Sequence, residues 1–216
     1  MIEVPQRSAE FGLRGCRGIP AGLYCHFNTA KLLKRIQAMQ LRNGRRSMRF
    51  NLVDRIVEVQ PGRLIRAAKS LTLGEEYLAD HFPTFPVMPG VLMLQTLVEA
   101  GAWLLRVSED FAYSLIVLRE ARNVKYGNFM EPGRRMDVTT ELVETGPELA
   151  SFRGRGEVDG NTTVSARFTM ARYNLRDRDP RLAGVDARIV DDLRSRYILL
   201  SAGMGQVAAG TGARPI

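Results

Sequence analysis

The chain has 216 residues, of which 45% are hydrophobic and 25% charged, a composition typical of an ordinary soluble protein with one domain and extensions. The net charge is +8, but residues 48–180 hold 17 Lys/Arg and 18 Asp/Glu, so the main body is close to neutral. A nucleic-acid-binding domain would carry its positive charge on the folded surface, and we therefore expect no nucleic-acid partner. No apolar run predicts membrane insertion and the first residues lack a secretory apolar core, which favours a cytoplasmic location.

Residues 1–47 differ from the rest of the chain, because they hold 9 Lys/Arg and only 2 Asp/Glu. We interpret them as a basic appendage outside the fold, arising either from a start codon placed too early, with Met48 as the natural start, or from a transit peptide. Cys16 and Cys25, with His26, do not form a recognisable zinc pattern, so free thiols are expected.

The main body, residues 48–180, alternates between strand and helix signals. Two extended stretches at 53–60 and 63–73 precede a short helical or loop piece at 74–82 and a long helix from about Pro89 to Arg106. Three or four antiparallel strands follow, separated by Gly- and Pro-containing turns. This order predicts an α+β fold, in which one long central helix is wrapped by a curved antiparallel sheet. Residues 181–216 are expected to form an extension with a short helix and a flexible tail.

The stretch HFPTFPVMPGVL, from His81 to Leu92, resembles the signature loop of the β-hydroxyacyl-acyl-carrier-protein dehydratases of the FabZ/FabA type. The segments FMEPGRRMDVTTELV, GRGEVDGNTTVSARF and LVDRIVEVQPG are similar to other parts of the same family, so the likeness covers about residues 48–175. The resemblance implies the hotdog fold and a role in fatty acid biosynthesis. The activity it implies is the loss of water from a (3R)-hydroxyacyl thioester to give a trans-2-enoyl thioester.

That reaction needs a base for the C2 proton, and the resemblance implies that His81 supplies it, because imidazole titrates near neutral pH. Pro89 needs no N–H at a helix start, and Gly90 lets a substrate approach the free backbone N–H groups that stabilise a thioester enolate. Val87 and Phe85 join Gly90 and Pro89 as expected substrate-binding residues.

The group that protonates the departing hydroxyl is less clearly marked. The family places a carboxylate fourteen residues after the histidine, where this chain has Gln95, and Glu99 follows one helical turn later. An amide is not a proton-donating acid. Either Glu99 reaches the site, directly or through one water, as an acid with a raised pKa, with Gln95 and a water as the second choice on the hydroxyl side. Or the protein is a weak dehydratase that relies on His81 and the oxyanion site, or it has kept acyl binding and lost the chemistry. In the last two cases Glu99 would bond a neighbouring loop or a partner subunit.

The resemblance also implies partners. The family's histidine works with an acid from the other subunit, so a homodimer or a trimer of dimers is expected. Acyl carrier protein, which is acidic, is the expected substrate carrier, with Arg122, Lys125, Arg134 and Arg135 as candidate docking residues. No metal site or cofactor is expected, since the main body has one histidine and no cysteine. A non-catalytic acyl-binding protein and a hotdog thioesterase are the alternative functions.

Overall fold

The computed structural model describes residues 51–204. The predictions for residues 1–47, for Met48 as a start and for the tail beyond residue 204 lie outside this range. Within it, the α+β order expected from the sequence is confirmed, with two strands before the long helix and four after it.

Six strands form one antiparallel sheet in the order β1-β2-β4-β5-β6-β3. The strands are β1 (Arg55–Gln60), β2 (Leu64–Ser70), β3 (Leu115–Tyr126), β4 (Arg135–Thr145), β5 (Leu149–Val158) and β6 (Asn161–Tyr173). β1 and β3 lie at the two edges, and the other edge of β3 pairs with no strand in the described range. Twelve residues of unpaired edge are an open template for another strand.

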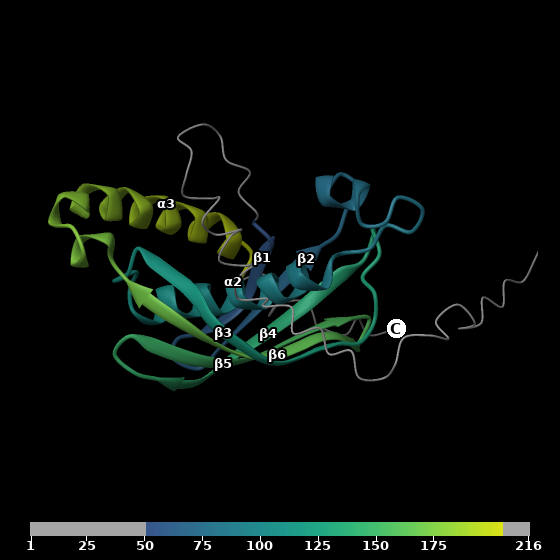
Figure 1. The fold of residues 1–216 in the computed structure, drawn as a ribbon, viewed down its shortest axis with the longest axis horizontal. Coiled ribbons are helices and arrows are strands. Elements are labelled where there is room, and N and C mark those ends of the chain that lie inside the picture. The colour runs from purple at the N-terminus through teal and green to yellow at the C-terminus, as the bar shows by residue number, and fades with distance from the viewer. Residues whose placement is uncertain (1–50, 205–216) are drawn as a thin grey trace, which may run out of the picture.

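The long helix α2 (Gly90–Ser108) lies across one face of the sheet, as Figure 1 shows. Its apolar side chains and those of the inward-facing strand positions make the core, including Leu94, Leu97 and Leu104, each 0% exposed. Gly101 permits the close packing, because a Cβ there would lie 3.1 Å from Met170 and Phe168 of β6. α2 is long and apolar enough to cross a membrane, the one such helix between residues 51 and 204, but 72% of its 18-residue apolar window is buried, which makes it a core helix.

Two short 3-10 turns, η2 (Leu175–Asp177) and η3 (Pro180–Leu182), lead into α3 (Ala183–Ser201). α3 occupies the stretch where the sequence predicts a short helix, and it lies beside β1 (Figure 1). Its Tyr197 ring sits 6.2 Å from that of Trp103 on α2 and 5.9 Å from that of Phe111. The first part of the extension is therefore joined to the core.

Asp186 anchors α3 at its first turn. Its carboxylate is buried and accepts hydrogen bonds from Leu175 N at 3.0 Å, Arg176 N at 2.9 Å and Ser114 Oγ at 2.5 Å. Burial alone acts to raise the pKa of Asp186, but these donors outweigh it and lower the pKa. The extension is thus fixed to the loop before β3 as well as to α2.

Candidate active site

The proline-rich loop before α2 is closed on itself around His81. His81 Nδ1 lies 3.1 Å from the carbonyl oxygen of Val87, and Val87 N donates back to the His81 carbonyl at 3.2 Å. Met88 N then donates to Met130 O at 2.9 Å, which ties the loop to the β3–β4 connection. The backbone pairing of residues 81 and 87 sets the position of the imidazole.

This arrangement determines which ring nitrogen of His81 is available. A carbonyl oxygen accepts only, so Nδ1 carries the proton and donates it to Val87. Nε2 has no hydrogen-bond partner between residues 51 and 204, and its lone pair is free. A neutral imidazole with a fixed Nδ1–H and a free Nε2 is the form that a general base requires.

The N-terminus of α2 provides hydrogen-bond donors next to His81. Pro89 precedes the helix, no side chain caps it, and Leu92 N and Met93 N both donate to Pro89 O, at 2.9 and 3.1 Å. Gly90 N and Val91 N belong to the first turn, where backbone N–H groups have no acceptor within a helix. These two donors and the positive end of the helix dipole can stabilise a negatively charged oxygen.

A cavity of about 350 Å³ joins the two features. Its lining residues come from the loop, from the start of α2 and from the end of β3 with the loop that follows: His81, Met88, Gly90, Val91, Met93, Tyr126, Gly127, Asn128 and Phe129. Phe85 does not line the cavity, but its ring meets that of Phe129 edge-on with centroids 5.7 Å apart. Phe82, Phe85 and Phe129 are at least 45% exposed, so the cavity lies within a half-exposed aromatic patch.

Gln95 lies one helical turn beyond Val91, outside the residues that line the cavity. Its side-chain oxygen is buried and accepts no hydrogen bond from any described residue. A buried amide oxygen without a donor is costly, by roughly 1–3 kcal/mol. The side-chain oxygen of Gln95 therefore lacks a hydrogen-bond donor within residues 51–204, and a donor would have to come from a group outside them.

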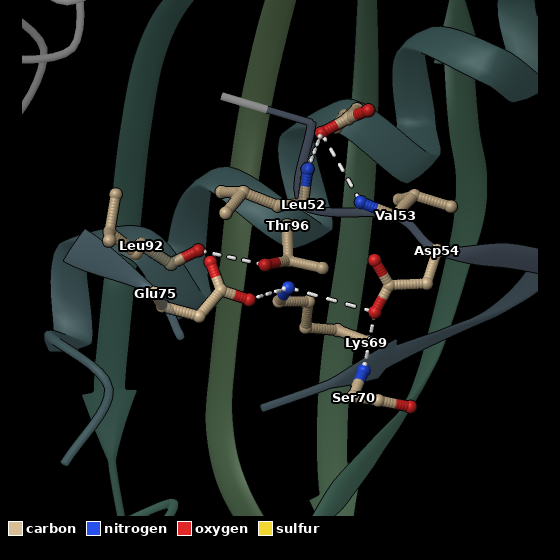
Figure 2. A network of polar contacts seen from close by, with 9 residues as sticks. Leu52, Val53, Asp54, Lys69, Ser70, Glu75, Leu92 and Thr96 are labelled. Atoms are coloured by element: carbon tan, nitrogen blue, oxygen red, sulfur yellow. Dashed lines mark hydrogen bonds and ion pairs between the residues drawn. The ribbon is translucent and has the colours of Figure 1, made fainter. Parts of the chain in front are cut away.

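Glu99 lies further along α2, about 13 Å from Gly90 along the helix axis. Its carboxylate accepts from Leu52 N at 2.8 Å and from Val53 N at 3.4 Å, ahead of β1 (Figure 2). Burial raises its pKa, while the two backbone donors and the nearby Arg196 and Arg106 oppose that rise. Within one protomer the Glu99 carboxylate is thus occupied by backbone amides and does not line the His81 cavity.

A second polar cluster joins β2 to the chain before β1 and to the segment before η1 (Figure 2). Lys69 of β2 is only 3% exposed and its ammonium lies 2.6 Å from Glu75 and 3.6 Å from Asp54. Asp54 also accepts from Ser70 N at 2.6 Å. Glu75 directly precedes η1 (Glu76–Ala79), so the buried lysine joins β2 to the segment that leads into the loop.

The candidate docking cations differ in their surroundings. Arg122 is paired with Glu120 at 2.8 Å, Arg134 with Asp159 at 2.7 Å and Arg135 with Asp137 at 2.6 Å, whereas Lys125 has no ion pair in the described range. Strand pairing places Arg122 beside Arg167 and Arg167 beside Arg153, which forms an arginine row across β3, β6 and β5. Directly opposed like charges are destabilising, so this row favours an acidic neighbour.

Tyr126 and Phe129 also line the cavity, although no motif in the sequence marks them as site residues. Tyr126 ends β3, thirty-six residues after Gly90 in the chain, and the β3–β6 pairing brings it to the start of the helix. A strand ending in an aromatic residue followed by glycine is the only local signal, and by itself it does not indicate a site.

A model of the FabA-like domain matches residues 45–167. The 3-hydroxyacyl-acyl-carrier-protein dehydratase FabZ of Nitratidesulfovibrio vulgaris strain DP4 is 36% identical over 130 residues, covering 59% of this chain and 84% of that protein. FabZ of Bacillus subtilis strain 168 is 31% identical over 122 residues, covering 56% and 86%.

Among solved structures, the dehydratase heterocomplex ApeI:P of Xenorhabdus doucetiae matches with a TM-score of 0.51 at 16% identity, covering 62% of this chain and 90% of that one. At this identity the match bears on the fold alone, which is the hotdog fold expected from the loop sequence. With more than half of its length matched by the family model, the chain belongs to the FabA-like family, alongside the FabZ-type dehydratases.

Proposed function

We propose that this protein removes water from a (3R)-hydroxyacyl thioester carried by acyl carrier protein and gives the trans-2-enoyl thioester. The observation that carries the proposal is the placement of His81, with Nδ1 bonded to Val87 O and Nε2 without a partner among residues 51–204, beside uncapped backbone donors at the start of α2. Its membership of a family with FabZ-type dehydratases supports the same reaction.

In the proposed reaction His81 takes the C2 proton of the substrate. The hydrogen bond from Nδ1 to the Val87 carbonyl fixes the tautomer and stabilises the imidazolium that forms. General-base catalysis of this kind contributes about 10²–10⁴ in rate.

The thioester oxygen gains charge as the C2 proton leaves. Gly90 N and Val91 N, which have no acceptor in the helix, are placed to donate to that oxygen. Pro89 leaves no competing donor before them. The missing side chain of Gly90 leaves room for the ring of Tyr126, which lines the same cavity. Val87 acts through the hydrogen bond that its carbonyl accepts from His81, and the Phe85 ring packs against Phe129, which lines the cavity.

The group on the hydroxyl side was predicted to be Glu99, with Gln95 and a water as the second choice. Both assignments remain predictions. For Glu99 to act, its carboxylate must give up the Leu52 and Val53 amides or reach a site in a partner subunit. Turnover by Glu99→Gln tests the first assignment, and turnover by Gln95→Ala tests the second.

Purified protein mixed with a 3-hydroxyacyl carrier protein is the primary experiment, read by mass spectrometry of the acyl group. We expect a loss of 18 Da, the mass of water. His81→Ala is the matched control and should give no enoyl product. An unchanged substrate with the wild-type protein would contradict the proposal, and a free acid would assign the protein to thioesterases.

Gln95 favours a second candidate, a non-catalytic acyl-binding protein. The amide oxygen is buried and the position lacks the acid that the dehydratase resemblance implies. In that case the wild-type protein would bind the acyl carrier without turnover, and Gln95→Glu would produce enoyl product. Activity in the wild-type protein excludes this alternative.

We further propose that the protein works as a homodimer, alone or as a trimer of dimers, in the cytoplasm. The unpaired twelve-residue edge of β3 and the half-exposed aromatic patch around the cavity support an interface there. Sedimentation of the purified protein tests the assembly, and a monomer that retains full activity would overturn it.

The arginine row and Lys125 support docking of an acidic carrier protein on the part of the sheet formed by β3, β6 and β5. Arg153 and Arg167 are exposed and have no ion pair among the described residues. Arg134 and Arg135, already paired with aspartates, should contribute less.

A further inference from the structure

The His81 cavity contains a second ionisable side chain. Among the nine residues that line it, only His81 and Tyr126 can exchange a proton with a substrate. Neither Gln95 nor Glu99 is among them. The protomer itself therefore presents one candidate base and one candidate acid to the same space.

The position of the Tyr126 ring is set by the helix start. A Cβ on Gly90 would lie 2.9 Å from Cε1 of Tyr126 and 3.1 Å from its Cζ, so the ring rests directly on Gly90. The hydroxyl is bonded to Cζ and thus lies close to the uncapped end of α2. The backbone is held behind it, because Gly127 N donates to Thr163 O at 2.9 Å.

The hydroxyl of Tyr126 has no partner within the described part of the protomer. It makes no hydrogen bond to any residue between 51 and 204, and the residue is 49% exposed. Partial burial raises the pKa of Tyr126, so the phenol keeps its proton at neutral pH. A phenol with no partner and a retained proton can donate to a substrate oxygen.

We propose that Tyr126 is the catalytic residue on the hydroxyl side, donating its phenolic proton to the departing 3-hydroxyl group in place of the carboxylate that position 95 lacks. The inference rests on the proposed dehydration and deepens it. Under this proposal Glu99 has a structural role through its hydrogen bonds with Leu52 and Val53, and Gln95 donates no proton.

The step balances within the cavity. His81 Nε2 takes the C2 proton, the C2–H electron pair forms the C2=C3 bond, and the C3–O bond breaks. The departing oxygen takes the phenolic proton and leaves as water. The resulting phenolate and imidazolium are neutralised when the imidazolium proton returns to Tyr126 through a water molecule.

Tyr126→Phe is the decisive variant, because it removes one oxygen and keeps the ring on Gly90. We expect kcat to fall by about 10²–10⁴, the range for a general acid, with KM near the wild-type value. Tyr173→Phe, at the other end of the β3–β6 pair and outside the cavity, is the matched control and should keep full activity. Thermal unfolding of both variants checks that each is folded.

A second substrate distinguishes proton donation by the Tyr126 hydroxyl from a role of that hydroxyl in positioning the ring. A 3-chloroacyl thioester loses chloride, which needs no proton, so Tyr126→Phe should process it at a rate close to that of the wild-type protein, while His81→Ala should not. A ring-positioning role would lower both reactions together, and that result would overturn the proposal.

The outcomes distinguish the inference from the proposed function. A wild-type protein that gives no enoyl product refutes both. An active wild-type protein with fully active Tyr126→Phe refutes the inference alone, and loss of turnover in Glu99→Gln would then assign the acid to Glu99.

Discussion

The two ends of α2 have opposite surroundings. At Gly90 the helix is uncapped, next to a cavity and within a patch of half-exposed aromatic side chains. Around Glu99 to Arg106 the helix is covered by the chain before β1 and by α3, and burial lowers the pKa of Arg106 to about 10. The first end leaves donors open to the cavity, whereas the second end is buried, and its Trp103 Nε1 and Arg106 Nε have no hydrogen-bond partner among residues 51–204.

This difference bears on Gln95 and Glu99, which lie one helical turn apart on α2. A carboxylate at position 95 would lie one turn from the open end, whereas Glu99 lies in the closed region and bonds two backbone amides. The same chemical group therefore has a different role when it is moved by one helical turn. Substitutions at the open end should change rates, and those at the closed end should change stability.

The largest expected effect is on catalysis by His81→Ala. Loss of the base should lower kcat/KM by about 10²–10⁴, measured as enoyl formation from a 3-hydroxyacyl carrier protein. The free energy of unfolding should change by less than about 1 kcal/mol, because His81 is only partly buried. A large loss of stability would remove the distinction between the two ends.

Glu99→Ala should act in the opposite way. It leaves the Leu52 and Val53 N–H groups without their acceptor, and we expect a loss of about 2–4 kcal/mol in the free energy of unfolding, measured by urea denaturation. Glu99→Gln retains an acceptor oxygen and should lose less. Equal stability of all three proteins would show that the backbone bonds contribute nothing.

A pH series tests whether the pKa of Glu99 is raised in the folded protein. Burial raises its pKa above 4.5 in the folded state, so the folded protein binds more protons than the unfolded one in the window above 4.5. The stabilising contribution of this group is complete below pH 4.5 and is lost as the pH rises through the folded pKa. The stability difference between the wild-type protein and Glu99→Gln should therefore decrease as the pH rises, and an increase would contradict the raised pKa.

The smallest expected effect concerns the arginine row. Arg167→Glu should raise KM for a carrier-bound substrate several-fold, by about 1 kcal/mol of binding, without changing kcat, and added salt should reduce the difference. A small pantetheine thioester should show no change. Arg135→Glu, whose native side chain is paired with Asp137, is the matched control.

The sequence alone determined the class of fold and marked the loop that carries His81. Period-two and helical patterns mark the strands and α2, because burial of one face imposes those spacings. Pro89, Gly90 and His81 lie within ten residues of one another, so a local motif shows them together. The contact of small Gly101 with β6 also agrees with the expected close wrapping.

Only the tertiary structure decided which other groups meet His81. Tyr126 comes from the end of β3, and the β3–β6 pairing that carries it to Gly90 is a long-range contact with no local sequence signal. Glu99 faces amides that precede β1, forty-six and forty-seven residues away, and α3 joins the core through Tyr197. Sequence spacing fixes the face of a helix on which a side chain lies, but the segment packed against that face is fixed by the fold.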